Sequence, residues 1–124
     1  IHAPNFSNEL FFAESEGRIL AAALINFYHA QKGESAATYL HGASSHEHRE
    51  MMAPHLLHWR IIQEAKKRGC GTYDFWGIDE KKWPGVTRFK IGFGGDILEY
   101  PESVDVVYKR GLYRLYRFFR KMIR

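Results

Sequence analysis

The sequence predicts a mixed sheet of α+β or α/β type, in which three consecutive strands are followed by a helix and then by further strands. Three observations indicate this class. Two apolar segments flank a short glycine turn, an amphipathic helix follows the third strand, and aromatic-rich strand patterns come after it. With 124 residues, 45% of them apolar and 15% aromatic, the chain has the size of one domain with a substantial core.

A hairpin over residues 10–14 and 18–28 opens the predicted sheet, because Gly17 can adopt the positive φ of a short turn. Residues 18–28 are nearly all apolar, so we expect this strand to be covered on both faces. A polar turn at 31–34 then leads to a third strand at 37–43.

A helix is the clearest element of the sequence. Residues 44–47 offer N-cap side chains, Pro54 suits a first turn, the cations at 66–68 favour a helix C-terminus, and Gly69 ends the helix. Because it joins the third and fourth strands, this helix can form a parallel crossover. Its predicted buried face consists of Leu57, His58, Ile61, Ile62 and Ala65.

The second half of the chain is predicted to hold more strands and one further helix, within a single domain over residues 1–124. In chain order we expect a strand at 72–78, an exposed loop at 78–86 around Pro84-Gly85, a glycine-loosened bend at 87–95, strands at 96–100 and 104–109 around a turn at 101–103, and a basic helix over 109–124.

The formal net charge of +4 makes anionic partners plausible, either nucleic acid, nucleotide or lipid headgroup. The single cysteine, Cys70, fits a reducing compartment, and we expect a cytoplasmic location. No segment resembles a signal peptide, and no apolar run approaches the roughly 18–20 residues that span a bilayer. The first residues resemble mid-chain sequence, so we expect a piece of a longer protein.

Several polar residues in or near apolar segments are candidates for chemistry, but each has a structural explanation. Five of the seven histidines lie within residues 41–58, without a standard zinc spacing, so we expect no metal site. Cys70 is expected to be a small core residue. Asp74 and Asp105 interrupt apolar strands, where we favour structural hydrogen bonds, and Asp79 is expected in a solvated turn.

Residues 87–95, TRFKIGFGG, place Lys90 between aromatic residues and next to three glycines. The glycines match neither a P-loop nor a dinucleotide-binding fingerprint, so the residues alone leave open whether Lys90 lies in a site or in a loop. The C-terminal helix is amphipathic, with a basic face for phosphates or a docking face for another part of the protein. Its apolar face holds Leu112, Leu115, Phe119 and Met122.

Several segments together, in order and spacing, resemble one family over residues 17–124. They are YLHGASS, APHLLHWRIIQEAKKRG, YDFWGI, FKIGFGG, and EYPESVDVVYK followed by LYRLYRFFRK. This series is similar to the C-terminal acyltransferase-like domain of the FemABX family, which builds peptidoglycan cross-bridges. The resemblance implies a GNAT-like fold, usually present twice in the full protein.

The resemblance also implies a function. It implies transfer of an amino acid from aminoacyl-tRNA to an amine on the stem peptide of a peptidoglycan precursor, either lipid II or the soluble UDP-MurNAc-pentapeptide. Aminoacyl-tRNA is then a co-substrate, and no bound cofactor is implied. Peripheral contact with the cytoplasmic membrane face and a homo-oligomer are further partners that stay open at this point.

Site residues follow from the same resemblance. Phe89 and Lys90 carry over as the catalytic pair, with Lys90 as the cation for a developing oxyanion or for tRNA phosphates, and Phe89 as a stacking surface for a terminal base. Asp74 or a substrate group is the candidate base. The substrate-binding candidates are Tyr39, Arg49, Tyr73, Asp74, Trp76, Gly92 and Gly94, and the tRNA- or anion-binding candidates are Arg110, Arg114, Arg117 and Lys121.

Family members commonly run to more than twice this length, with a first acyltransferase-like domain, so it is open whether this chain is active alone.

Two other functions stay open. An acyl-CoA N-acyltransferase is the first alternative, but residues 42–54 lack the glycine pattern of a pyrophosphate loop. A non-catalytic basic module that binds RNA or membrane through its C-terminal helix is the second.

Overall fold

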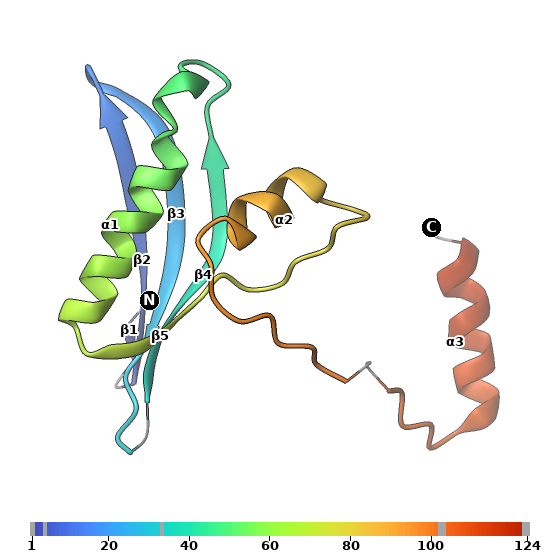
Figure 1. Ribbon diagram of the computed structural model, residues 1–124. Helices are drawn as coiled ribbons and strands as arrows, with labels where there is room; N and C mark the ends of the chain where they lie inside the picture. Colours follow the sequence, from blue (N-terminus) through green and yellow to red (C-terminus); the bar gives the residue numbers. More distant parts are fainter. Residues whose placement is uncertain (1, 4, 33, 102–103, 123–124) are drawn as a thin grey trace. The chain divides into compact units, whose positions relative to one another are not determined.

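The computed structural model describes residues 2–3, 5–32, 34–101 and 104–122. The chain divides into two compact units, the first ending at Gly94 and the second beginning at Gly95. Each unit is described by itself. The first unit holds the sheet, two α-helices and the candidate catalytic pair (Figure 1).

The first unit is built on a five-stranded sheet in the order β1-β2-β3-β4-β5. The first four strands pair antiparallel, whereas β5 pairs parallel to β4 across α1 (Ala53–Lys67). The predicted hairpin and the parallel crossover are therefore confirmed. The strands are β1 (His2–Ala3), β2 (Phe6–Ser15), β3 (Arg18–Tyr28), β4 (Ser35–Ser44) and β5 (Cys70–Asp74).

The β2–β3 turn has two residues with left-handed backbone between the paired Ser15 and Arg18. Glu16 has φ 51° and Gly17 has φ 76°, as a type I′ hairpin turn requires at both central positions. The expected positive φ at Gly17 is confirmed, but Glu16 takes the same strained region, which few non-glycine residues do.

The core lies between α1 and one face of the sheet. Alternate residues of β3, from Ala21 to Phe27, are buried against the helix, as their period of two dictates. The expected cover on both faces of β3 is wrong for the described residues, since Leu24 on the opposite face is only half-buried and Leu10 and Phe12 of β2 are exposed. The buried residues of α1 are Ala53, Leu57, His58, Ile61 and Ala65.

Helix α1 begins later than residues 44–47 suggest. Ser44 still belongs to β4, and the hydroxyl of Ser45 accepts a hydrogen bond from the Glu47 amide (3.0 Å), in a turn before the helix. The short 3-10 helix η1 (Arg49–Met51) follows, and α1 is capped by Met52. Pro54 in the first turn and Gly69 (φ 80°) after the C-cap are as predicted.

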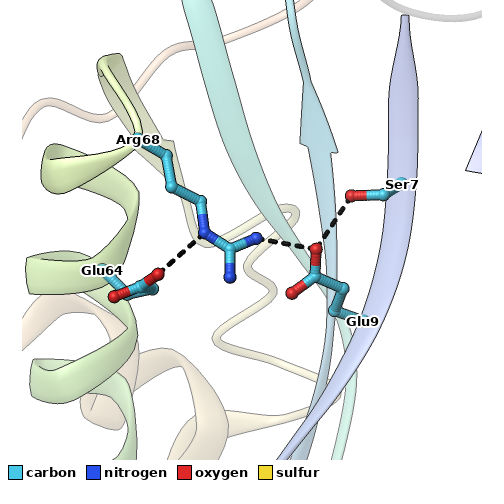
Figure 2. A network of polar contacts seen from close by, with 4 residues as sticks. All are labelled: Ser7, Glu9, Glu64 and Arg68. Atoms are coloured by element: carbon cyan, nitrogen blue, oxygen red, sulfur yellow. Dashed lines mark hydrogen bonds and ion pairs between the residues drawn. The ribbon is translucent and has the colours of Figure 1, made fainter. Parts of the chain in front are cut away.

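A polar network fastens the end of α1 to β2 (Figure 2). Arg68 Nη1 donates to Glu9 Oε1 (2.7 Å) and Arg68 Nε donates to Glu64 Oε1 (2.9 Å), while Ser7 donates to Glu9 (3.0 Å). The guanidinium also lies 4.3 Å from the ring centroid of Phe27. Arg68 therefore covers the end of the core as well as pairing the two acids.

Two predictions for the segment after α1 are wrong. The strand expected at 72–78 begins at Cys70 and ends at Asp74. The loop expected at 78–86 ends at Pro84, where helix α2 (Pro84–Ile91) begins, so residues 87–95 are a helix and its exit, with no bend of a sheet. Proline fits the first helical turn, where its missing N–H has no partner to lose.

The second unit contains α3 (Arg110–Met122), which confirms the predicted C-terminal helix. The strands expected at 96–100 and 104–109 are not found in the described part of this unit. The turns expected at 31–34 and 101–103 include residues 33 and 102–103, which lie outside the described residues. The last two residues of the helix expected over 109–124 lie outside them too. Within the described ranges, no helix is both long and apolar enough to cross a bilayer.

Candidate functional site

An aromatic cluster in the first unit surrounds His58. It draws on β4, α1, β5, α2 and the segments that follow β5 and α2. We define the aromatic cluster as Tyr39, His55, His58, Tyr73, Phe75, Phe89 and Phe93.

His58 lies at the centre of the cluster and is 2% exposed. Its ring centroid lies 4.4 Å from that of Tyr39 and 5.4 Å from those of Phe75 and Phe89. The Tyr39 and Phe89 contacts are edge-to-face, the arrangement that the quadrupoles of aromatic rings favour. One buried side chain of α1 thus meets rings from β4, α2 and the segment after β5.

A hydrogen bond joins His58 to β5. The Nδ1 atom of His58 lies 2.8 Å from the hydroxyl oxygen of Tyr73. Burial, with smaller contributions from the charges of Lys90 and His55, lowers the pKa of His58 to about 4. Burial also raises the pKa of the Tyr73 hydroxyl far above its ordinary value. Both groups are therefore neutral near pH 7.

The side chain of Lys90 extends from α2 toward Tyr39. Its Nζ donates a hydrogen bond to the carbonyl oxygen of Gly77 (2.8 Å) and lies 5.4 Å from the ring centroid of Tyr39. Partial burial lowers the pKa of Lys90, and the charge of Asp74 opposes this shift. The structure thus brings the predicted Phe89, Tyr39 and Tyr73 together in the aromatic cluster. It places the ammonium of the predicted Lys90 next to the Tyr39 ring of that cluster.

A locked turn sets where α2 begins. The buried hydroxyl of Thr87 accepts a hydrogen bond from the Asp79 amide (3.0 Å), and the carbonyl of Asp79 accepts one from the Trp83 amide (2.8 Å). The Asp79 carboxylate accepts hydrogen bonds from the amides of Lys81 and Lys82. Asp79 is a turn residue, as expected, and it fixes the start of the helix that carries Lys90.

Asp74 and Trp76 stand at the border of the cluster. Both are exposed, and Asp74 Oδ1 accepts a hydrogen bond from the Trp76 amide (2.7 Å), which confirms the expected structural hydrogen bond of Asp74. A role of Asp74 in binding or as a base stays a prediction. Trp76 has φ 63° and is 62% exposed. A large aromatic side chain held in the left-handed region and facing solvent is uncommon, and it keeps Trp76 as a binding candidate.

The remaining candidates of the first unit differ in position. Arg49 is exposed in η1 and takes no part in the ring contacts of the described residues. Gly92 is the C-cap of α2, and an added Cβ would meet the carbonyl oxygens of Arg88 and Phe89 at 3.3 Å. Gly94 has φ 77°, which only glycine adopts at little cost. Gly92 and Gly94 thus shape the end of α2.

In the second unit, α3 separates basic and apolar residues. The four anion-binding candidates, Arg110, Arg114, Arg117 and Lys121, recur at three- and four-residue spacing and are exposed. The hydroxyl of Tyr113 donates to Asp105, which confirms the expected hydrogen bond of Asp105 although that residue lies outside any strand. A hollow of this unit is lined by Asp105, Tyr113, Tyr116, Arg117, Arg120 and Lys121.

Histidine and cysteine side chains are the usual ligands of a zinc ion. Among the described residues, no group of three or more His, Cys, Asp or Glu could hold a metal ion. Cys70 begins β5, half-buried against the core, and burial raises the pKa of its thiol. The interpretation of Cys70 as a small residue packed against the core is confirmed.

Sequence reasoning missed part of the cluster. His55, Phe75, Phe93 and the Gly77 carbonyl were not among the candidates, and His58 was predicted only as part of the buried face of α1. A histidine within an otherwise apolar helix stripe was the available signal, because a buried imidazole needs a polar partner. The partner, Tyr73, is fifteen residues away and could not be paired with it from spacing.

Comparison with known protein families decides the relationship. The FemAB family model matches residues 5–121. The chain belongs to the FemAB family. It is 31% identical over 112 residues to a lipid II:glycine glycyltransferase of Staphylococcus epidermidis, covering 86% of this chain and 26% of the relative. It is 32% identical over 105 residues to the Staphylococcus aureus (strain USA300) protein of the same name, covering 81% and 24%.

A third relative of this FemAB-family chain is the aminoacyltransferase FemA of S. epidermidis. The two are 27% identical over 89 residues, covering 68% of this chain and 21% of FemA. The chain thus spans about a quarter of the length of the curated relatives it matches. The resemblance drawn from the ordered motifs is confirmed.

Solved structures confirm the GNAT-like fold of the FemAB-family chain. A Trypanosoma brucei acetyltransferase aligns with a TM-score of 0.57 and 16% identity, over 82% of this chain and 70% of that one. A ribosomal-protein-alanine N-acetyltransferase of Brucella melitensis aligns with a TM-score of 0.58 and 16% identity, over 81% and 70%. At these identities the likeness concerns the fold alone.

Proposed function

We propose that this chain is part of an aminoacyltransferase that adds an amino acid to the stem peptide of a peptidoglycan precursor in interpeptide bridge formation. Membership of the FemAB family supports the reaction class, and the names of the glycyltransferase relatives support lipid II as an acceptor. We propose aminoacyl-tRNA as the donor, without a bound cofactor. The observation that carries the proposal is the position of Lys90, which is held by Gly77 and Tyr39 at the edge of the aromatic cluster.

The proposed reaction is an aminolysis of an ester. The acceptor amine attacks the aminoacyl carbonyl carbon, and negative charge develops on the carbonyl oxygen. The amide bond forms as the bond from that carbon to the ribose oxygen of the tRNA breaks. The proton that the amine loses ends on the leaving ribose oxygen, which departs as a hydroxyl group. Because the ester is already activated, positioning and charge stabilisation are the main demands on the enzyme. An ammonium group is suited to the developing oxyanion or to a tRNA phosphate.

The surroundings of Lys90 suit this role. Its ammonium carries three N–H groups, one of which donates to the Gly77 carbonyl. Partial burial lowers its pKa, and a more acidic donor in a less polar setting makes stronger hydrogen bonds to a developing negative charge. Trp76, exposed beside this position, is proposed to contact the precursor or the tRNA end.

The test is a transfer assay with the full-length protein. Radiolabelled glycyl-, alanyl- and seryl-tRNA are supplied with lipid II or UDP-MurNAc-pentapeptide, and extension of the stem peptide is followed by mass. An extended product with one of these pairs supports the proposal. Binding of coenzyme A together with no transfer from any charged tRNA would instead support an acyl-CoA-dependent enzyme.

A further inference from the structure

We propose that His58 is a positioning residue for Lys90, acting through Tyr73, Tyr39 and Phe89. The inference rests on the proposed function in one respect, the use of Lys90 in the transfer step. The geometry that supports it lies wholly within the first unit and does not depend on the identity of the substrates.

His58 contacts the rings of two residues that fix the position of Lys90, namely Phe89 and Tyr39. On the backbone side, the neighbouring Phe89 ring lies 5.4 Å from the His58 ring and 4.9 Å from that of His55. On the ammonium side, Lys90 Nζ lies over Tyr39, whose ring is 4.4 Å from that of His58. A displaced imidazole would therefore move the helix that carries Lys90 and the ring on which its ammonium rests.

A histidine meets two requirements at this position. Its ring fills the space between Tyr39, Phe75 and Phe89, and its Nδ1 supplies the hydrogen-bond partner for Tyr73. Phenylalanine would keep the ring but leave the partly buried Tyr73 hydroxyl without this bond, which costs free energy. An aliphatic side chain would lose both.

A positioning role fits better than a proton-accepting one. The titratable groups around His58 are Tyr39, His55, Tyr73 and Lys90, and burial together with the Lys90 ammonium keeps the imidazole neutral. An imidazole with a pKa of about 4 is a poor acceptor for the proton of an amine near pH 7. Its uncharged form, in contrast, can lie next to the Lys90 ammonium without repulsion.

The first test reads the coupling of His58 to Lys90 without substrate. The pKa of His58 is measured by NMR titration of its ring protons in the wild type and in Lys90→Met. Removal of the ammonium is expected to raise the pKa of His58. An unchanged value would overturn the inference while leaving the proposed function intact. In the control Lys81→Met, an exposed lysine of the 79–83 turn, the pKa of His58 stays at the wild-type value.

The second test separates kcat from KM in the full-length protein. Tyr73→Phe removes one oxygen, and His58→Phe keeps a ring but loses the hydrogen bond. Each is expected to lower kcat about tenfold with little change in KM, as for an interaction used in the transition state. Tyr28→Phe, at the exposed end of β3, is the control and is expected to keep the wild-type kcat.

The results of His58→Phe and Tyr73→Phe decide whether His58 positions Lys90. If His58→Phe fails to fold, Tyr73→Phe alone decides, because it removes a single atom. A wild-type kcat in folded Tyr73→Phe, or a loss confined to KM, would overturn the inference. Loss of activity in Lys90→Ala together with normal activity in Tyr73→Phe would reject the positioning role and retain the proposed function.

Discussion

Phe89 and Lys90 are neighbours in α2 but have different surroundings. Phe89 can therefore anchor the short helix while Lys90 stays available to a substrate. Successive helical side chains point about 100° apart, so Phe89 turns toward His55 and His58 while Lys90 reaches Gly77 and Tyr39. The ring contacts of Phe89 favour anchoring of α2 over stacking on a base. The role of Phe89 in the reaction stays a prediction.

The neutral His58 makes stability depend on pH. Its pKa is about 4 in the folded protein and near 6.5 when unfolded, so the unfolded chain binds more protons between these values. The stabilisation is complete above pH 6.5 and is lost as the pH falls toward 4, by about 3 kcal/mol at most. Urea unfolding of the wild type and of His58→Gln between pH 4 and 7.5 checks this.

His58→Gln should remove this part of the pH dependence, so the difference in unfolding free energy between variant and wild type shrinks as the pH falls. The exposed His46 provides the matched control, His46→Gln. Parallel curves for the wild type and His58→Gln over the whole range would show that His58 titrates alike in the folded and unfolded states, against the expectation.

Gly42 makes room for Tyr39. A Cβ at Gly42 would meet the hydroxyl end of Tyr39, with the Cζ atom at 2.9 Å. Gly42→Ala is therefore expected to push the Tyr39 ring away from His58 and Lys90, lowering kcat and costing about 1–3 kcal/mol of stability. Thermal unfolding and transfer rate are the measurements. Gly85→Ala in α2, where a Cβ meets nothing within 4 Å, should be neutral or stabilising.

At the scale of elements, α1 organises the first unit. Its apolar stripe packs on β2 and β3, its buried His58 faces the aromatic cluster, and its last turn is fastened to β2 by Arg68. The same helix thus stabilises the sheet and sets the position of α2. A change at the end of α1 is expected to affect stability more than the site, because Arg68 takes no part in the ring contacts of the cluster.

Arg68→Ala removes two ion pairs and the cover of Phe27. Since both pairs are partly exposed, we expect a loss of about 1–2 kcal/mol in unfolding free energy rather than the larger cost of a buried charge. A double-mutant cycle with Glu9→Gln in urea unfolding measures the Arg68–Glu9 contribution. Strictly additive effects of the two substitutions would mean that this ion pair contributes nothing.

Over the whole chain, local patterns predicted the hairpin, α1 and α3 but not α2, and the strands expected at 96–100 and 104–109 are not found in the described residues. The hairpin, α1 and α3 follow from turn chemistry and periodicity within short segments. Helix α2 was missed because Pro84-Gly85 resembles a loop signal. The glycines at 92, 94 and 95, which follow this helix of only eight residues, also indicated a bend. Proline in a first helical turn and glycine at a helix end produce the same sequence pattern as a loop.

The candidate site was only partly predictable for a different reason. Lys90 and Phe89 were found through the family resemblance, whereas the cluster that holds them joins residues from 39 to 93. Contacts of that separation depend on the pairing of β4 with β5 and on the packing of α1, which no local period encodes. The buried histidine of α1 was visible in the sequence, but its partners were not.

The basic face of α3 is predicted to bind the tRNA donor through phosphates. Arg114→Gln with Arg117→Gln should weaken tRNA binding. The negative slope of log affinity against log salt should become less steep, by about 0.7 for each phosphate that is no longer neutralised. Fluorescence anisotropy with labelled tRNA at several salt concentrations measures both. The control exchanges two exposed lysines of α1, Lys66→Gln with Lys67→Gln. Equal slopes in both double variants would contradict this role of α3.

If Lys90 stabilises the transition state of aminoacyl transfer, as we propose, its removal must lower the rate constant of that transfer. The rate constant kcat is determined for the full-length wild type, Lys90→Ala and the exposed control Lys81→Ala, with the same charged tRNA and precursor. We expect kcat to fall about a hundredfold or more in Lys90→Ala and to keep the wild-type value in Lys81→Ala. A wild-type kcat in Lys90→Ala would contradict it.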